Sequence, residues 1–585
     1  MTRLERLQAA KSLSDLAKIL NYTPRGLAYV LYKTSAETRY RTFDIPKSGG
    51  GVRTIQAPKP QLKLVQSRLT DLLSDCLDKI EAEKPDRRRV SHGFQKGRSI
   101  VTNAKAHTRR RFVLNLDLKD FFGTINFGRV RGFFIADRNF RLDPKVATVV
   151  AQIACHNNAL PQGAPSSPVI SNLIGHILDA RLIRLAREHG CTYTRYADDL
   201  TISTNRRNFP RRLARASLFK SSRWIIGKQL KDAIKKSGFL INPSKTRMQI
   251  LGSRQETTGL IVNEKVNIRK EYYRSVRSMC SSLFRTGEYY VESVADADGS
   301  EEPVRTSKLA PLEGRLAHIY YVKARRDLSR RDKKLAEFKI PKAPQELYRR
   351  FLFYKYFVAS DEPVLVTEGM TDIIYLRTAI KALREKFPTL VHTEGDQTEL
   401  SVRFLNSSPV NQHVLNLGTG FTGMTQVISA YELRLKPYSF RPLEHPVIFI
   451  VDNDEGGENV LKAANKTSQQ DVKPTSTDAF FHIRRNLYLV KTPPGIDGSL
   501  SAIEDCFPEE VLKQEIGGKR LDLKKKHGDE LNFGKRIFAE QIVRPGVNNI
   551  DFSEFSPILD GISKAIIDYD TRRNEAAERS TAKSA

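Results

Sequence analysis

The sequence predicts an α+β domain followed by an α/β domain with a parallel sheet. A chain of 585 residues is too long for a single hydrophobic core, so it should fold as several units. In the first 310 residues strand-like runs occur among amphipathic helices, whereas after residue 350 apolar strands alternate with helices, which is typical of a parallel sheet. A mean hydropathy of -0.43 and the lack of any long apolar run argue against a membrane protein.

Positive charge is concentrated in the first part of the chain. Residues 1–350 carry 68 Lys and Arg against 33 Asp and Glu, whereas residues 351–585 carry 29 against 33. A surface made basic only for solubility would not predict this asymmetry. So basic a field attracts polyanions, and nucleic acid is the commonest one in the cytoplasm.

The N-terminus and the cysteines indicate a cytoplasmic protein. Charges recur through residues 1–20, where a signal peptide would have its apolar segment. The five cysteines form no CxxC pair, which argues against a zinc ribbon and against a disulfide framework. We therefore expect a cytoplasmic location and no membrane partner.

Hydrophobic periodicity predicts the elements of the first part in chain order. They are short helices over 1–45, a Gly-rich turn at 48–51, a strand ending at Pro58, a helix over 61–80, a strand at 112–118, a helix over 169–188, a strand-like run at 191–204 and a helix over about 223–237.

The second part begins after a change of composition. Residues 291–345 are first acidic and loop-like and then strongly basic, which is typical of a linker. Beyond them the pattern predicts a strand at 363–369, a helix over 371–387, and strands at 413–417 and 446–454. The last residues, from about 570, are polar and predict a frayed tail.

Two adjacent aspartates, Asp198 and Asp199, interrupt the strand-like run RYADDLTIST. Charged pairs are poor strand residues, so the pair predicts a tight hairpin. A third acid, Asp117, ends the strand FVLNLD. Carboxylates from two neighbouring strands are able to hold two Mg²⁺ ions about 4 Å apart, which activates a 3′-hydroxyl and stabilises pyrophosphate in nucleotidyl transfer. The alternative is an ordinary turn, in which Asp is common.

Four motifs in a fixed order resemble those of reverse transcriptases. They are FVLNLDLKDFF at 112–122, LPQGAPSSPVISN at 160–172, RYADD at 195–199 and INPSKTR at 241–247. The resemblance implies an α+β right-hand polymerase, with fingers and palm over 1–235 and a thumb and RNA-binding region over 236–310.

The resemblance also implies roles for the acidic residues. Asp117 and Asp198 would ligate two catalytic Mg²⁺ ions, and Asp199 would complete the cluster. Lys245, in the motif INPSKTR, matches the lysine that protonates pyrophosphate.

Four further positions match residues that bind the nucleotide. Phe122 matches the aromatic gate that stacks under the sugar and excludes a 2′-hydroxyl, which implies dNTP substrates; a core phenylalanine is the alternative. Gln162 and Gly163 match the loop that contacts the incoming nucleotide and the template. Arg53 is a candidate triphosphate clamp, because guanidinium binds phosphate in a bidentate way.

Two patches resemble the retron branch of reverse transcriptases. NAKAH at 103–107 matches the motif NAxxH, and TTG at 257–259 lies where the branch has VTG. The alternative for the first patch is a set of helix caps or solvent-facing residues. The positions that match are Asn103, Ala104, His107, Thr257, Thr258 and Gly259.

Membership of this branch implies a specific product and specific partners. Retron enzymes bind a cognate structured noncoding RNA, start from the 2′-hydroxyl of an internal guanosine, and make a branched single-stranded DNA joined to RNA, called msDNA. The thumb would read the RNA stem through the basic and aromatic run at 267–290. Its aromatic residues have the thumb's own core as an alternative role.

Two motifs of the second part, PVLVTEGMTDIIYL and VIFIVDNDEGG, resemble the signatures of a Toprim domain. Acids at the C-terminal ends of neighbouring parallel strands converge at one edge of the sheet. Glu368, Asp452 and Asp454 would bind Mg²⁺ or Mn²⁺, and Glu368 would also transfer protons. Loop acids after buried strands are the alternative. The supporting residues implied are Gly369, Asp372 and Lys535, together with the glycine turn LGTGFTG at 417–423.

Toprim chemistry fits a topoisomerase, a primase or a nuclease. Segments 501–508 and 533–540 resemble the nuclease branch, so we expect a nuclease effector with a nucleic-acid substrate. Such a fusion resembles bacterial antiphage retrons, in which a homo-oligomer assembled with msDNA is one expected state. The alternatives are a group II intron-like reverse transcriptase or maturase, and a retron whose Toprim domain is a non-catalytic assembly module. The remaining ranges are a basic linker at 311–350, the Toprim domain with its extension at 351–570 and a polar tail at 571–585.

Overall fold

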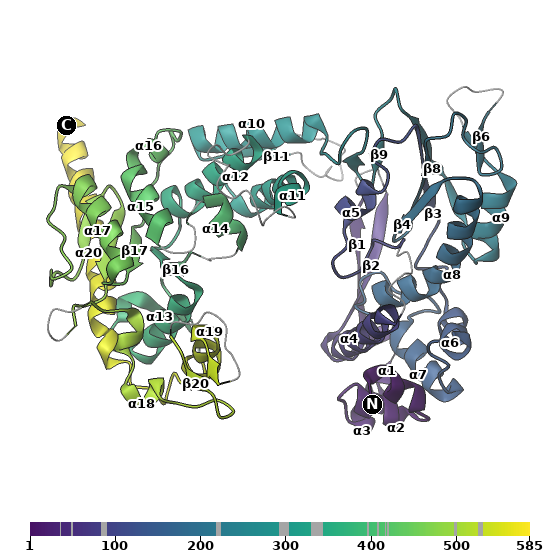
Figure 1. Cartoon of the computed structure of the whole chain (residues 1–585), viewed down its shortest axis with the longest axis horizontal. Coiled ribbons are helices and arrows are strands. Elements are labelled where there is room, and N and C mark those ends of the chain that lie inside the picture. Colours follow the sequence, from purple (N-terminus) through teal and green to yellow (C-terminus); the bar gives the residue numbers. More distant parts are fainter. Residues whose placement is uncertain are drawn as a thin grey trace. The chain divides into compact units, whose positions relative to one another are not determined.

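The computed structural model divides into two compact units, Met1–Tyr272 and Tyr273–Ala585 (Figure 1). This boundary falls inside the range 236–310, so the range predicted as the thumb is divided almost equally between the two units. None of the helices in the described residues is both long and apolar enough to cross a bilayer. The structure describes residues 1–35, 37–47, 51–83, 90–217, 224–291, 303–328, 343–394, 397–405, 409–415, 417, 421–495, 500–523 and 531–584.

The first unit begins with short helices that precede a β-hairpin. The hairpin strands are β1 (Tyr40–Pro46) and β2 (Val52–Pro58), which pair antiparallel. The helices of this unit include α1 (Arg3–Ala9), α2 (Leu13–Ile19), α3 (Pro24–Ala28), a π-helix (Tyr29–Lys33), a 3-10 turn (Glu37–Arg39), α4 (Pro60–Ala82), α5 (Ile100–Lys105), α6 (Phe127–Ala136), α7 (Pro144–Ala154), α8 (Ser167–Glu188) and α9 (Lys228–Lys236). Helices α1 to α4, α6 and α7 gather at one end of the unit (Figure 1).

The centre of the first unit is a four-stranded antiparallel sheet in the order β4-β5-β3-β8. Its strands are β3 (Phe112–Leu118), β4 (Thr192–Tyr196), β5 (Asp199–Thr204) and β8 (Ile241–Ile250). The unit also contains two small hairpins, each a separate two-stranded sheet. They are β6 (Ala214–Ala216) with β7 (Trp224–Ile226), and β9 (Glu256–Thr257) with β10 (Leu260–Ile261).

Side chains on the two faces of β3 have different roles: one face packs in the core, and the other carries Asp117. Leu114, Leu116 and Leu118 point to the hydrophobic core of the unit, because side chains two residues apart share one face of a strand. Asn115 and Asp117 therefore lie on the opposite face. Burying three leucines on one side holds the aspartate at a fixed place on the other.

The second unit starts with a mostly helical region that is rich in aromatic residues. Phe284 of α10 (Lys270–Thr286) lies with its ring centroid 5.5 Å from Tyr354 and 5.0 Å from Tyr438. We call these three residues the thumb aromatic cluster. The neighbouring elements are β11 (Tyr289–Val291), β12 (Val304–Thr306), α11 (Leu309–Leu328), α12 (Ala343–Phe353) and a π-helix (Tyr354–Val358).

A five-stranded, mostly parallel sheet forms the core of the second unit, in the order β16-β13-β17-β19-β18. Strands β13 (Val364–Val366) and β17 (Val447–Val451) are adjacent, parallel and entirely buried, as continuous apolar runs in α/β domains are. The others are β16 (Arg403–Phe404), β19 (Leu487–Lys491) and the antiparallel β18 (Phe481–Arg484).

Helices and small strands complete the second unit around this sheet. They are α13 (Met370–Ala382), a 3-10 turn (Pro388–Leu390), β14 (Val391–Glu394) with β15 (Gln397–Leu400), α14 (Pro409–Leu415), α15 (Phe421–Ser429), α16 (Tyr431–Leu435), α17 (Glu455–Ser468), a 3-10 turn (Ile503–Cys506), α18 (Glu509–Leu512), β20 (Arg520–Leu521) with β21 (Asn532–Phe533), α19 (Lys535–Ile537), a π-helix (Phe538–Val543), a 3-10 turn (Ser553–Phe555) and the long α20 (Ser556–Ser584).

Some expected elements differ from the structure. The strand predicted at 413–417 is wrong, because helix α14 covers Pro409–Leu415 and buries Val414 and Leu415. A short apolar run fits either element when only its periodicity is known. Helix α9 is shorter than predicted, since β7 precedes it, and α11, α12 and α20 extend into the ranges predicted as linker and tail. Residues 48–50 and 418–420 of the two predicted glycine turns lie outside the described residues.

Candidate functional site

The first acidic cluster lies where β3 meets the hairpin of β4 and β5. Asp117 on β3 is paired in register with Asp199 on β5, and Asp198 belongs to the two-residue turn that joins β4 to β5. Ala197, the first turn residue, has a φ of 55°, the left-handed conformation that tight hairpin turns require. The Leu118 amide donates to the Asp198 carbonyl at 3.0 Å. The three acids are therefore brought together.

Burial and mutual repulsion set the proton affinity of this cluster. Burial, followed by the charges of Asp198 and Asp117, raises the pKa of Asp199 to about 7. Burial also raises the pKa of Asp198. Lys245 Nζ lies 2.9 Å from Asp117 Oδ2, and Asn242 Nδ2 donates to Asp117 Oδ1 at 3.2 Å. The hydrogen bond to Asp117 raises the pKa of Lys245, which stays a cation.

The donor set suits a divalent cation that is shared with substrate. In the part of the chain that the structure describes, no three His, Cys, Asp or Glu side chains are arranged as a complete metal site. Mg²⁺ in phosphoryl-transfer sites is commonly held by one or two carboxylates together with substrate phosphates and water. Buried carboxylates with raised pKa values are stabilised by a nearby cation, a role that the Lys245 ammonium fills here.

Of the residues predicted to bind the nucleotide, Arg53 lies near this cluster, and Gln162 and Gly163 contact strand β2. The Gln56 amide of β2 donates to the Gln162 carbonyl at 2.7 Å, which joins the hairpin of β1 and β2 to the loop at 160–165. Gly163 has a φ of 117°, and a Cβ there would lie 2.9 Å from Ile55 Cγ2, so any other residue would be strained. Arg53 is close enough to lower the pKa of Asp198 electrostatically.

Phe122 and its neighbour Phe121 have different environments. Phe121 is buried and stacks on Phe239 at 5.4 Å between centroids, so it is a core residue. Phe122 is only partly buried, and its ring lies 6.3 Å from that of the exposed Phe94. Of the two phenylalanines, Phe122 is therefore the one with a surface available to a ligand.

The NAKAH patch packs against strands β4 and β5 of the sheet that carries the first acidic cluster. Asn103 and His107 are fully buried, and the His107 ring is hydrogen-bonded to Ser203 of β5 and Thr194 of β4 at 2.7 Å each. Burial lowers the pKa of His107 to about 3, so the ring is neutral. The alternative, in which Asn103 and His107 face solvent, is wrong, because both side chains are buried.

The TTG patch forms the turn between β9 and β10. Thr258 and Gly259 both have positive φ, as a two-residue hairpin of this type requires. Thr258 Oγ1 donates to the Ile100 carbonyl at the start of α5, at 3.4 Å. The turn that carries the TTG patch is therefore hydrogen-bonded to the helix that carries the start of the NAKAH patch.

The second acidic cluster lies at the C-terminal edge of the parallel sheet. Glu368 follows β13, and Asp452 and Asp454 follow the adjacent β17, so their carboxyl groups meet at one edge as the sequence predicts. Burial, then Asp372 and Asp454, raise the pKa of Glu368 to about 7. Burial, then Asp372 and Glu504, raise the pKa of Asp452 to about 8.

Hydrogen bonds fix the acids of this cluster. The Ile503 amide donates to Asp452 Oδ1 at 3.0 Å, and Asp454 caps α17 by accepting from the Gly457 amide at 2.8 Å. Asp372 Oδ2 accepts from the Gly369 amide at 2.8 Å.

One member of the second cluster was not predicted. Glu504 is only 2% exposed, lies in the segment 501–508, and pairs with Lys535 Nζ at 2.8 Å. Its position in the segment that resembles the nuclease branch pointed to a functional role. A single glutamate in a sequence does not by itself indicate a site. Lys535 therefore meets the acids through Glu504, which adds a further carboxyl to the site.

Mg²⁺ should stabilise the second unit more at high pH than at low pH. Free carboxyl groups of an unfolded chain lose their protons near pH 4, whereas Glu368 and Asp452 keep theirs to about 7 and about 8. The metal-free fold therefore loses stability as pH rises through this window, and a bound cation offsets the loss. We expect the Mg²⁺-induced increase in Tm to grow between about pH 6 and about pH 8.5.

Calorimetry with and without saturating MgCl₂ measures this increase. The paired variant Glu368→Gln, Asp452→Asn serves as the control and should lose the pH-dependent part. An equal Mg²⁺ effect at both ends of the pH range would contradict the assignment of these acids as ligands.

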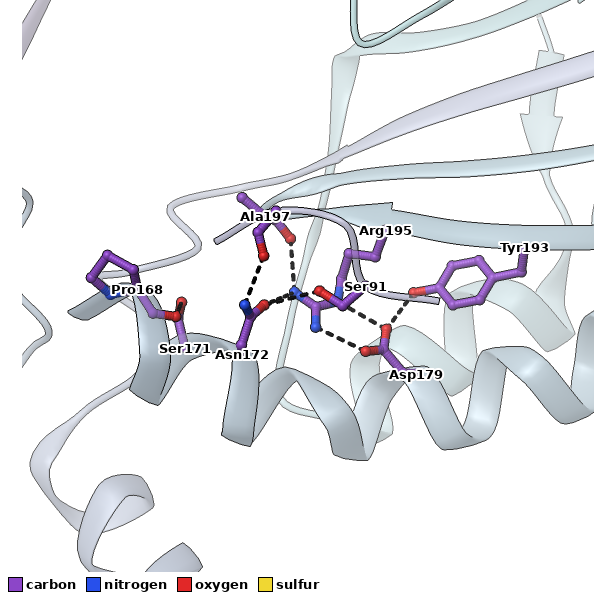
Figure 2. A network of polar contacts seen from close by, with 9 residues as sticks. Ser91, Pro168, Ser171, Asn172, Asp179, Tyr193, Arg195 and Ala197 are labelled. Carbon is purple, nitrogen blue, oxygen red and sulfur yellow. Dashed lines mark hydrogen bonds and ion pairs between the residues drawn. The ribbon is translucent and has the colours of Figure 1, made fainter. Parts of the chain in front are cut away.

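A buried polar network supports the turn that carries Asp198 (Figure 2). Arg195 Nε and Nη2 donate to Asp179 Oδ1 and Oδ2 at 2.8 Å each, and Tyr193 donates to Asp179 Oδ1 at 2.8 Å. Arg195 Nη1 donates to the Ala197 carbonyl and to Asn172 Oδ1, both at 3.2 Å. We call Asn172, Asp179, Tyr193 and Arg195 the turn anchor. The motifs contain Asn172 and Arg195, but nothing in their spacing predicts this role.

Comparison with known proteins identifies the class of the first unit. Residues 45–267 match the family described as reverse transcriptase (RNA-dependent DNA polymerase), and this range contains both strands of the first acidic cluster. The first unit thus has the reverse transcriptase fold, and the protein is an RNA-directed DNA polymerase. Members of this family generally use divalent metal ions, typically Mg²⁺.

Individual relatives show which branch of the reverse transcriptases the chain resembles. The chain is 34% identical over 281 residues to the retron Ec86 reverse transcriptase of Escherichia coli, a match that covers 48% of this chain and 80% of that protein. It is 35% identical over 283 residues to the retron Mx162 reverse transcriptase of Myxococcus xanthus, covering 45% of this chain and 55% of that protein. The chain belongs to the retron reverse transcriptase family.

Solved structures add nothing to this assignment. A structure of apo telomerase from Candida tropicalis, truncated from its C-terminal domain, gives a TM-score of 0.28 at 14% identity, covering 39% of this chain and 55% of that chain. An overlap at this level supports no conclusion.

Proposed function

We propose that this reverse transcriptase copies a cognate structured noncoding RNA into branched msDNA, starting from a 2′-hydroxyl of that RNA. The observation that carries the proposal is the register of Asp117 opposite Asp199, with Asp198 in the adjoining turn. The buried motifs that are typical of retron enzymes support the same product, since they brace the strands of this site.

The side chains of the first cluster divide the work of nucleotidyl transfer. Mg²⁺, when bound, activates the attacking hydroxyl and stabilises charge on the pyrophosphate. Asp117 and Asp198 orient that cation, and Asp199 completes the acidic cluster. Lys245 has a side chain that is 61% exposed, so it is free to leave Asp117 and to donate a proton to pyrophosphate. Phe122 excludes a 2′-hydroxyl, and Gln162, Gly163 and Arg53 contact the dNTP.

We further propose that the second unit is a Toprim nuclease that serves in antiphage defence in the cytoplasm. Support comes from Glu368, Asp452 and Asp454, which converge at one sheet edge. Burial and the neighbouring acids raise the pKa values of Glu368 and Asp452 into the range useful for proton transfer. Glu368 would act as the proton-transfer group, and Lys535 would stabilise phosphate charge. In this proposal msDNA and its RNA restrain the nuclease until infection disturbs them.

Nucleic acid that copurifies with the chain tests the polymerase proposal. When the chain is expressed with the DNA upstream of its gene, we expect one RNA joined to a short single-stranded DNA through a 2′–5′ linkage. Sequencing before and after debranching measures the joint and the branch nucleotide. A group II intron-like reverse transcriptase or maturase would instead carry unbranched RNA, and that result would reject the msDNA proposal.

A further inference from the structure

Asn172 joins two segments that meet at the polymerase site. Its side chain is 6% exposed and lies between the catalytic turn and residues 91–93 (Figure 2). Its Oδ1 accepts from Arg195 Nη1 at 3.2 Å and from Ser91 Oγ at 3.0 Å, and its Nδ2 donates to the Gly93 carbonyl at 2.7 Å. One carboxamide thus holds two pieces of chain in a fixed relation.

The first piece is the turn that carries Asp198. Arg195 is fully buried, and its bidentate pair with Asp179 leaves the guanidinium one position, from which Nη1 reaches the Ala197 carbonyl. Helix α8 admits the guanidinium only because residue 175 is glycine, where a Cβ would lie 2.9 Å from Arg195 Cζ. The residues of the turn anchor therefore determine the position of Ala197.

The second piece is the segment that leads to Phe94. The His92 amide donates to the Arg195 carbonyl at 2.7 Å, and a Cβ at Gly93 would lie 2.6 Å from the Ala197 amide nitrogen. Phe94 follows with a φ of 56°, and its ring lies beside that of Phe122. A shift of this segment against the turn would therefore move Phe94 relative to Phe122.

We propose that Asn172 is a positioning residue that sets substrate specificity, because it fixes the segment that carries Phe94, the ring beside Phe122, relative to the catalytic turn. This inference rests on the proposed role of Phe122 as the sugar gate. Rejecting one hydroxyl group by contact demands placement to a fraction of an ångström, since a displacement of about 1 Å costs an enzyme on the order of a hundredfold. The amide donor of Asn172 contacts the gate-side segment through Gly93, whereas its acceptor contacts that segment through Ser91 and the turn side through Arg195.

Two variants of Asn172 distinguish the role of its amide donor from the role of its acceptor. Asn172→Asp keeps the acceptor and removes the donor to Gly93, so the preference for dNTP over rNTP should fall by about tenfold while the Mg²⁺ requirement changes by less than about twofold. Asn172→Ala removes both, so the preference should fall and the Mg²⁺ requirement should rise. The measurement is single-nucleotide incorporation by the full chain on a primed RNA template, with Mg²⁺ titrated for each nucleotide.

Ser171→Ala is the matched control. Ser171 is the buried neighbour on the same helix, and its hydroxyl donates only to the Pro168 carbonyl within that helix, at 2.8 Å (Figure 2). It should leave both readouts unchanged. Gly93→Ala, which crowds the Ala197 amide without touching the helix, should lower the dNTP preference as Asn172→Asp does.

The outcomes distinguish this inference from the function on which it rests. Asn172→Asp and Gly93→Ala with the wild-type dNTP preference would overturn the inference. Phe122→Ala, measured in parallel, tests the gate itself: if it left the preference intact, the gate assignment would fail. An inactive wild-type chain would reject the polymerase assignment.

Discussion

Asp198→Asn is expected to abolish DNA synthesis, with a loss of at least about a thousandfold in incorporation rate. The aspartate lies in the turn between β4 and β5, beside Asp117 and Asp199, and its carboxylate charge cannot be replaced by the amide. Charge stabilisation by a cation is worth several kcal/mol in the transition state, which corresponds to at least this factor. Primer extension on an RNA template measures the rate.

The control for this change is Asp143→Asn. Asp143 caps helix α7 by accepting from the Lys145 amide, and asparagine caps a helix equally well, so the fold and the rate should be unchanged. Retention of synthesis by Asp198→Asn would remove this residue from the catalytic cluster.

Glu368→Gln is expected to abolish protection against phage while leaving DNA synthesis intact. Glutamine keeps the size of the side chain but neither binds a divalent cation as a carboxylate does nor transfers a proton. The first acidic cluster belongs to the other compact unit, so msDNA should form in normal amounts. Plaque counts on bacteria carrying the variant measure protection, and extraction of msDNA measures synthesis.

Glu458→Gln provides the comparison, because Glu458 is an exposed acid one turn into α17 that pairs with Lys462 at 3.0 Å. It should protect as the wild type does. If Glu368→Gln also protected, the second unit would be a non-catalytic assembly module, which is the alternative that the sequence left open.

Elements with a strong local pattern were predictable from the sequence. The apolar runs at 446–454 and 112–118 became β17 and β3, because buried strands leave short apolar runs in the sequence. The run at 413–417 was too short for its pattern to separate strand from helix. Its assignment depended on packing that only the fold supplies.

The site was predictable where residue type carried the information. Asp117, Asp198 and Asp199 stand out because carboxylates are unusual in and beside strand-like apolar runs. Arg195 and Glu504 do not, since arginine and glutamate are mostly exposed and give no sign of burial. The partner of Arg195 lies 16 residues earlier, on a helix whose inward face cannot be read from charge.

The thumb aromatic cluster limits where the chain could be divided by proteolysis or by gene fission. Cleavage within 311–350 would leave Phe284 on one fragment and Tyr354 and Tyr438 on the other, although their rings pack together. The fragments would stay associated or expose aromatic surface and aggregate. A division that keeps the three rings on one polypeptide would have to fall before α10, which would leave this helix with the second unit.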